Sequence, residues 1–433
     1  MREFLTGHRL RPRLRHRAVH ILAWCLIGVA GAPPRQIEAG DCRLEAGVRP
    51  VADESELPYN QPPIEYSRTA PRDPVALLQR QIERHDITLQ SREKSGVLKD
   101  LLRSLRIPES SQLLVFSKSS ANARLIQPAT PRALYFNDDV YVGWVPGSSM
   151  IEVSAVDPTL GGTFYSLRQP PDGGIQLQRD ESCLLCHLSR STLRVPGHLV
   201  RSFTTDALGQ LQTGWSRITH DTPYDKRWAG WYVTGQTGDL KHLGNVFGMR
   251  AADPNSPPLP APAFELAKAC DLTRYLSSES DVVPHLVLDH QAHGHNLITR
   301  LNYEVRLAKP VSSLEPLVRY LLFLDEPPLP NRVAGGAEYR TWFERQGRCD
   351  AQGRSLRQFD LQTRLFKHRL SYLIQSPAFN GLPETTRRDV LLRIKDHLVA
   401  TDPKHPAAVI PTTERRTILQ IVRETTGDLP PGW

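Results

Sequence analysis

The chain has 433 residues, of which 54 are Lys or Arg and 46 are Asp or Glu, so its formal net charge at pH 7 is +8. Residues 1–40 hold seven Arg and two acidic residues, which leaves about +3 for the remaining 390 or so residues. No basic run with interleaved aromatic residues follows, and this excludes the usual composition of a nucleic-acid-binding surface.

Residues 1–40 have the composition of a targeting segment. Six arginines precede an apolar run at 18–32, which ends in small residues. This order is typical of a bacterial export signal. The run is short for a membrane span, which needs about 20 residues, so a signal peptide is favoured and an uncleaved N-terminal anchor is the alternative. Both place the body of the protein outside the cytoplasm, in the periplasm.

Residues 41–110 are predicted to form an extended arm followed by short helices. Residues 43–73 are rich in Pro and charge and have no period. Between residues 74 and 105, apolar residues recur at helical spacing in two groups, which predicts two short helices.

Residues 111–262 are predicted to be a strand-rich, haem-binding region. Runs of β-branched and aromatic residues alternate with Pro, Asn-Asp and Gly-Ser turn signals, and they predict a sheet of five or six strands that leads directly into Cys183. The predicted strands are 112–117, 133–136, 140–145, 151–156, 164–167 and 175–178.

Cys183, Cys186 and His187 form the pattern C-x-x-C-H, which is the attachment signal of a c-type haem. The two thiols add to the two vinyl groups of one macrocycle, and the histidine is placed to bind the iron as its proximal ligand. A zinc site would need further ligands, and Cys270 and Cys349 stand alone. A thioredoxin-like redox pair would begin a helix in a βαβ unit, whereas a short strand and a polar turn precede Cys183. We predict one covalent haem, with zinc, a redox pair and a structural disulfide as alternatives.

The rest of the chain changes from strands to helices. A turn and a strand are predicted at 195–203, an aromatic-rich block that would fill a core or cover a haem at 215–248, and a Pro-rich linker at 257–262. Residues 263–433 are predicted to be mainly helical, so the expected fold class is α+β. The predicted helices are 285–307, 314–322, 359–374, 387–399 and 414–425.

The second axial ligand of the iron has several candidates. The first choice is His290, which shares an apolar stripe with three leucines on the helix predicted at 285–307. Gly294, one turn later, would let a flat ring approach. His295 points about 140° away, which suits a supporting or surface role. A core histidine with no contact to iron is the plain alternative for His290. The alternative ligands are Met249, His198 and His242.

The chain also resembles a family of large exported bacterial proteins with a single C-x-x-C-H motif, described as cytochrome c domain proteins. The resemblance runs from about residue 55 to the C-terminus and implies export and haem, but no reaction. It rests on four stretches, 135–147 (YFNDDVYVGWVPG), 195–202 (VPGHLVRS), 230–235 (GWYVTG) and 242–245 (HLGN).

Two functions remain open, with haem-based sensing as a third. One is electron transfer to a periplasmic redox partner protein, and the other is a haem-dependent oxidoreductase, peroxidase-like or acting on a small molecule. An iron with two protein ligands transfers electrons, whereas an open position binds a small molecule.

Overall fold

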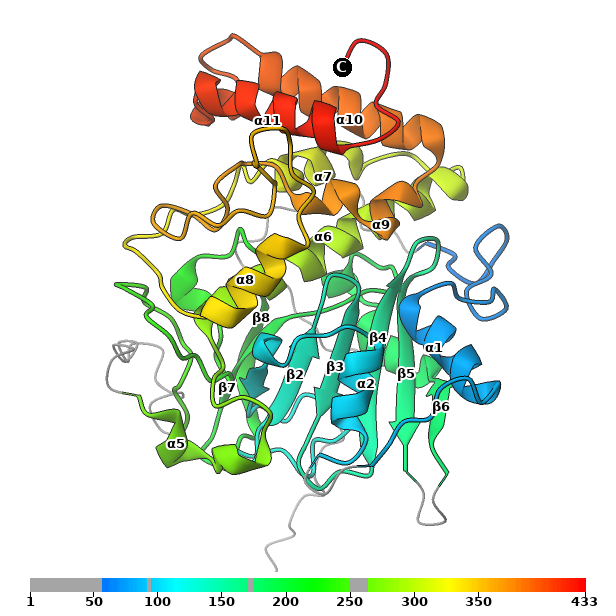
Figure 1. The fold of residues 1–433 in the computed structure, drawn as a ribbon, viewed down its shortest axis with the longest axis vertical. Helices are drawn as coiled ribbons and strands as arrows, with labels where there is room; N and C mark the ends of the chain where they lie inside the picture. The colour runs from blue at the N-terminus through cyan, green and yellow to red at the C-terminus, as the bar shows by residue number, and fades with distance from the viewer. Residues whose placement is uncertain (1–56, 92–94, 170–173, 249–263) are drawn as a thin grey trace, which may run out of the picture. The chain divides into compact units, whose positions relative to one another are not determined.

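A six-stranded antiparallel sheet is the largest element of the computed structural model, which describes residues 57–91, 95–169, 174–248 and 264–433 (Figure 1). Its strands follow the order of the chain, so each one pairs with its sequence neighbours. The strand-rich half and the α+β class are therefore confirmed. The strands are β1 (Leu113–Val115), β2 (Arg132–Phe136), β3 (Val140–Trp144), β4 (Met150–Asp157), β5 (Gly161–Arg168) and β6 (Gln176–Arg179).

Short polar turns close the hairpins of this sheet. Between β2 and β3, the side-chain oxygen of Asn137 accepts hydrogen bonds from the backbone N–H groups two and three residues later, at 3.1 and 2.9 Å. Between β4 and β5, Asp157 does the same at 2.8 and 2.9 Å. These local bonds satisfy the turn and set the strand register, which explains why the Asn-Asp and Pro signals were informative.

The two faces of the sheet have different partners. Val142 and Tyr165, on one face, share a hydrophobic core with α1 (Pro74–Glu83) and α2 (Leu98–Ser104), the two short helices that were predicted. Figure 1 shows both helices lying across the strands. Phe164, on the other face, contacts the haem-motif segment. The motif therefore lies against the face of the sheet that α1 and α2 leave free.

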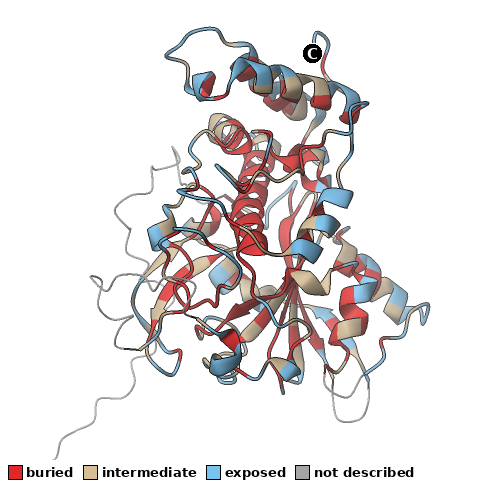
Figure 2. Cartoon of the chain, turned by 60° about the vertical axis from the view of Figure 1, so that its left-hand side comes forward, coloured by how far each residue is buried: buried red, intermediate tan, exposed pale blue. Residues whose placement is uncertain are grey.

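The longest helix is buried along almost its whole length. In α6 (Val282–Arg306), every residue from Val282 to Glu304 is buried, and this helix is red in Figure 2. In a helix that is buried on all sides, the polar residues are covered as fully as the apolar ones. The predicted apolar stripe around His290 is therefore no more buried than the rest of the helix.

The C-terminal region is helical, as predicted, with one exception. Residues 359–374 do not form the predicted helix. Their backbone closes a hairpin instead, in which Asp360 N–H donates to the Leu365 carbonyl and Lys367 N–H to the Gln358 carbonyl. The helices are α7 (Leu314–Leu321), α8 (Ala337–Arg345), α9 (Pro377–Asn380), α10 (Glu384–Val399) and α11 (Thr412–Thr425), with a 3₁₀ turn η7 (Tyr372–Gln375) after the hairpin.

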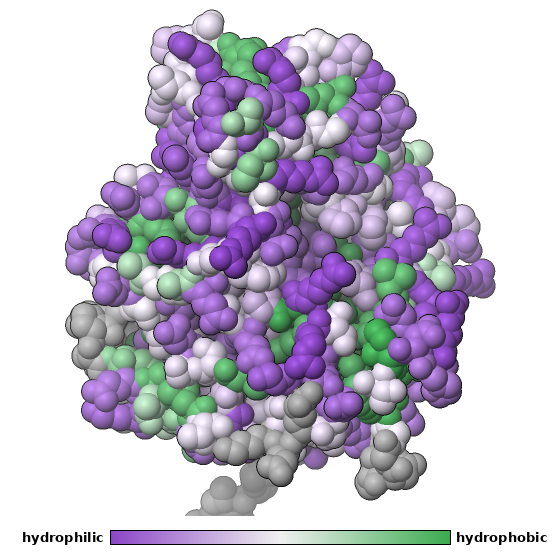
Figure 3. Space-filling model, in the orientation of Figure 1, coloured by the Kyte–Doolittle hydropathy of each residue, from purple (hydrophilic) through white to green (hydrophobic). Residues whose placement is uncertain are grey.

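Smaller elements complete the described residues. They include the hairpin of β7 (Arg201–Thr205) and β8 (Leu211–Arg217) and the short helix α5 (Leu266–Ala269). No helix among the described residues is long and apolar enough to span a membrane. Figure 3 shows small hydrophobic patches on a largely hydrophilic face. The targeting segment 1–40, Met249 and the linker 257–262 lie outside the described residues.

Candidate functional site

The C-x-x-C-H motif occupies one helical turn. The Asp180 carboxylate accepts a hydrogen bond of 3.1 Å from the backbone N–H two residues later and so caps the 3₁₀ turn η2 (Glu181–Cys183). This turn continues directly into α3 (Leu184–His187). Residues three and four apart share one face of such a turn. That face holds the three motif side chains, Cys183, Cys186 and His187.

Both thiols of the motif are free, as addition to a vinyl group requires. Cys183 packs against an apolar cluster that includes Leu184, and burial raises the pKa of its thiol to about 11. Cys186 is exposed. Cys270 and Cys349 are free thiols as well, so they do not form a disulfide with each other. The Cys183 thiol thus lies at the edge of the core, and the Cys186 thiol lies at the surface.

The imidazole of His187 is oriented by a hydrogen bond from one of its two ring nitrogens to the backbone. Its Nδ1 lies 2.9 Å from the carbonyl oxygen of Gly197, which can only accept, so Nδ1 carries the proton. Burial lowers the pKa of His187 to about 4, so the ring is neutral at pH 7. Nε2 then carries the lone pair, and it has no hydrogen-bonding partner among the described residues. A hydrogen bond from the second nitrogen to a carbonyl is the usual support of a metal-binding histidine.

The loop that orients His187 is fixed by α6. The amide oxygen of Asn296 accepts from the backbone N–H of His198 at 2.9 Å, and its NH₂ group donates to the His198 carbonyl at 2.7 Å. Gly197 lies so close to this amide that a Cβ atom there would be 2.3 Å from the Asn296 oxygen. Gly162 N–H donates to the carbonyl of Pro196 at 2.8 Å and joins the same loop to β5. The position of His187 therefore depends on α6 and on the sheet.

These residues fit a c-type haem. Two free thiols and a neutral imidazole with an accessible lone pair share one face. The Gly197 carbonyl orients the imidazole through its other ring nitrogen. Within the described ranges, no three His, Cys, Asp or Glu side chains are grouped so as to hold a metal ion by themselves. A haem needs one imidazole from this turn, because the macrocycle brings four nitrogen ligands of its own.

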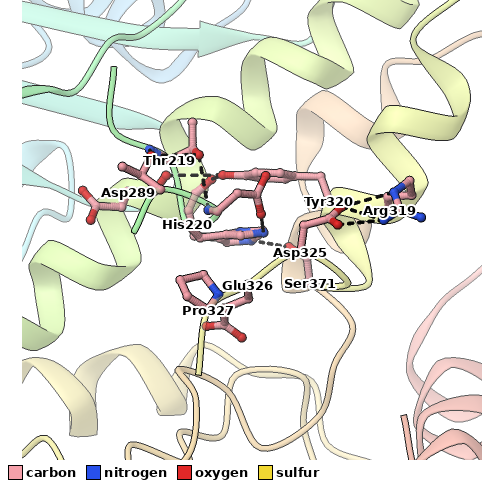
Figure 4. Close-up of polar contacts among 12 residues, drawn as sticks. Thr219, His220, Asp289, Arg319, Tyr320, Asp325, Glu326, Pro327 and Ser371 are labelled. Atoms are coloured by element: carbon pink, nitrogen blue, oxygen red, sulfur yellow. Dashed lines mark hydrogen bonds and ion pairs between the residues drawn. The ribbon is translucent and has the colours of Figure 1, made fainter. Parts of the chain in front are cut away.

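His290 belongs to a second, buried cluster. Its Nδ1 lies 2.6 Å from Nδ1 of His220, and its Nε2 lies 2.7 Å from the Ser371 hydroxyl. Tyr320 stacks on His220 with ring centroids 3.8 Å apart (Figure 4). His290 and Ser371 have no exposed surface, and His220 has 2%. Iron binding by His290 would therefore replace one of two short hydrogen bonds in a closed environment.

One end of this cluster reaches the surface. Nε2 of His220 lies 2.7 Å from the Asp221 carboxylate, off the ideal hydrogen-bond angle, and the Asp221 side chain is 37% exposed. Burial alone would raise the pKa of Asp221, but the neighbouring His220 lowers it below its ordinary value. The carboxylate favours a proton on Nε2 of His220, so its Nδ1 accepts from His290, and His290 accepts from Ser371. Hydrogen bonds therefore join His220 to Ser371 through His290, and the Asp221 carboxylate lies beside the outer end of this chain.

The other predicted ligands lie in different places. His198 directly follows Gly197, and its Nε2 contacts the Ser154 hydroxyl at 3.1 Å. The ring of His242 packs against that of Trp228, with centroids 5.4 Å apart, and its Nδ1 accepts a hydrogen bond from the backbone N–H of Gly244. Met249 lies outside the described residues. The structure thus brings Cys183, Cys186 and His187 together and leaves the second axial ligand a prediction.

Two expectations about α6 are corrected. Gly294 does not leave room for a flat ring, because a Cβ atom there would be 2.4 Å from Leu373. His295 is 1% exposed and has no surface role. Neither ring nitrogen of His295 has a hydrogen-bond partner within the described part of the chain. Both errors arise because η7 and the C-terminal helices cover a helix that was expected to be half exposed.

Sequence reasoning missed the groups that orient His187. Asn296 is 109 residues away from it in the chain, and no local pattern links the two. The Pro-Gly pair at 196–197 was a usable signal, since it marks a tight turn shortly after the motif. Comparison with models of protein families, with curated proteins and with solved structures finds no match for the chain.

Proposed function

We propose that this protein is an exported c-type cytochrome that carries one covalent haem and transfers electrons to a redox partner protein in the periplasm. Cys183 and Cys186 form the thioether bonds, and His187 is the proximal ligand of the iron. The haem, when bound, supplies the one-electron ferric/ferrous couple. The chain attaches the haem, orients it and provides the environment that sets its reduction potential.

One observation carries this proposal. His187 Nδ1 donates to the Gly197 carbonyl while Nε2 has no partner among the described residues, and both thiols on the same face are free. Several buried histidines also have a ring nitrogen without a partner among the described residues, so the support comes from the two thiols that share the face of His187. A zinc or disulfide role would need more ligands or a bonded sulfur pair. The arrangement therefore supports one axial imidazole next to two attachment points.

The surface position of the motif supports electron transfer. Cys186 is exposed and Leu185, in the same turn, is 76% exposed. A macrocycle bonded to Cys186 would keep one edge close to solvent, where a partner protein can approach. His290 and Ser371 are fully buried, whereas Cys186 is exposed, so we place electron transfer ahead of the oxidoreductase alternative.

The decisive experiment is attachment in a host with haem-maturation machinery. We expect the full-length protein to hold covalent haem after denaturing electrophoresis, Cys183→Ala and Cys186→Ala to show a single thioether by the pyridine haemochrome spectrum, and the double variant to show none. Cys349→Ala, another exposed thiol, is the matched control and should stain like wild type. Covalent haem in the double variant would refute the proposal.

The spectrum then separates transfer from catalysis. Low-spin bands in both the ferric and the ferrous protein support an electron carrier, whereas a high-spin iron that binds CO supports the oxidoreductase. Deletion of residues 1–40 tests export. We expect that deletion to give haem-free protein in the cytoplasm, because attachment follows translocation, and covalent haem in that form would contradict the periplasmic location.

A further inference from the structure

We propose that Arg132 and Arg201 bind the two carboxylates of the haem, its propionate groups. This inference rests on the proposed function, since it concerns the same cofactor. The propionates lie on the edge of the macrocycle opposite the thioether bonds, so their partners must come from elements other than the motif. Guanidinium groups are the natural partners, because their parallel N–H groups match the two oxygens of a carboxylate.

The register of the sheet places Arg132 near the motif. Phe164, whose ring centroid is 4.6 Å from that of His187, lies opposite Ser154 on β4. Glu152 is two residues from Ser154 on the same face, about 7 Å further along the strand. Its carboxylate lies 2.9 Å from Nη1 of Arg132. Arg132 therefore lies on the same face of the sheet as the C-x-x-C-H motif. Its partner Glu152 is two residues along β4 from Ser154, the residue opposite Phe164.

Arg132 keeps donors for a second carboxylate. Its Nη1 donates to Glu152, and its Nε is buried without a hydrogen-bond partner among the described residues. The side chain is 19% exposed, so it can be reached. Glu152 does not depend on Arg132, because the Ser120 hydroxyl and the Ala121 N–H also donate to it, both at 2.9 Å. A propionate can thus bind Arg132 without leaving Glu152 unsatisfied.

Arg201 approaches from the β7–β8 hairpin. It lies opposite Arg217 in the strand register, and Arg217 donates to the carbonyl of Ser191, four residues after His187. The Arg201 guanidinium lies over the ring of Trp215 at 5.1 Å. A stacked guanidinium still presents its N–H groups at the edge of the plane, where a carboxylate binds. The hairpin therefore holds a second, oriented cation beside the motif.

The test is the reduction potential of the covalent haem in full-length protein. We expect Arg132→Gln and Arg201→Gln to lower it, because loss of a nearby cation disfavours the reduced iron. For the double variant we expect about a tenfold change in the ferric-to-ferrous ratio, or about 59 mV for one electron. Arg132→Lys and Arg201→Lys keep the charge but lose the paired N–H groups of the guanidinium, so each should lower the potential by a smaller amount than its Gln counterpart. Arg68→Gln is the control, since that side chain is 85% exposed and, within the described ranges, forms an ion pair with Glu65 alone.

The outcomes are distinguishable. Absence of covalent haem from the wild type would refute the proposed function itself. If the wild type carries haem but both Gln variants keep the potential of Arg68→Gln, the assignment of the two arginines is wrong. If a Gln variant does not fold, its Lys counterpart decides. A Lys variant that folds with an unchanged potential and unchanged haem retention would also contradict a carboxylate-binding role, because a point charge cannot replace the paired N–H bonds.

Discussion

Asn296, in the middle of α6, holds the backbone of His198 through both halves of its side-chain amide, at 2.9 and 2.7 Å. Gly197, the residue before this contact, supplies the carbonyl that orients His187. A buried helix from the C-terminal half of the chain thus determines how the proximal histidine of the proposed haem points. The first two predictions test this link.

Replacing Asn296 with Leu should loosen the proximal histidine. The substitution leaves a buried N–H and a buried carbonyl of His198 without partners, at a cost of about 2–4 kcal/mol in the free energy of unfolding. We expect covalent haem to remain and the spin state or the reduction potential to change. Asn302→Leu is the matched control, because Asn302 lies on the same helix and donates to the Pro158 carbonyl instead. An equal spectral change in both variants would mean that the effect is one of general stability.

Gly197→Ala should have a similar effect by a steric route. A Cβ atom at Gly197 would lie 2.3 Å from the Asn296 oxygen, so the loop or the helix must shift. Overpacking of this kind costs about 1–3 kcal/mol. We expect a lower melting temperature and an altered ferric spectrum. Gly427→Ala, where a Cβ atom would meet nothing within 4 Å, should leave both unchanged. A wild-type spectrum in Gly197→Ala would show that this loop does not control the ligand.

His290→Ala distinguishes an iron ligand from a core residue. Its hydrogen bonds to His220 and Ser371 lead us to expect a loss of about 2–4 kcal/mol in the free energy of unfolding and no change of axial ligation. The measurements are denaturant unfolding and the ferric absorption spectrum. A change from low-spin to high-spin iron with CO binding would instead support the prediction from the sequence. Met249→Leu is the companion variant, and loss of a low-spin spectrum there would identify the methionine as the ligand.

Acid should destabilise the protein below about pH 6.5. Burial lowers the pKa of His242 to about 4 and that of His285 to about 3, from an ordinary value of 6.5. Between these values the unfolded chain binds protons that the folded chain does not. The free energy of unfolding therefore falls as the pH falls, by up to about 1.4 kcal/mol per pH unit for each such histidine. Burial raises the pKa of Asp281 and Asp289 to about 7, and these carboxyls reduce the net slope.

Urea unfolding at several pH values between 7 and 4 measures this slope. His285→Gln, whose amide can still donate to the Tyr232 carbonyl that His285 contacts at 2.9 Å, should unfold with a shallower pH dependence than wild type. His85→Gln is the control, since His85 is exposed. A slope that is the same in all three proteins would show that the buried histidine does not contribute.

Some features of this protein follow from local sequence. The strands β2 to β5 could be predicted because Asn137 and Asp157 form turns with their own neighbours, and alternation of side chains needs no distant contact. The common face of Cys183, Cys186 and His187 could be predicted for the same reason, since one helical turn brings them together. The α+β class follows from the change of hydrophobic period along the chain.

Other features depend on contacts between residues far apart in the chain. The period at 359–374 suits a helix, but most of the backbone there pairs across a hairpin that runs into η7. The stripe around His290 is one of several buried faces of α6, and its partners, His220 and Ser371, lie 70 and 81 residues away. His187 obtains its orientation from Gly197 and Asn296, and Arg132 and Arg201 reach its neighbourhood from two separate sheets. Only tertiary packing decides these positions, because burial and hydrogen bonding act between surfaces that no local pattern records.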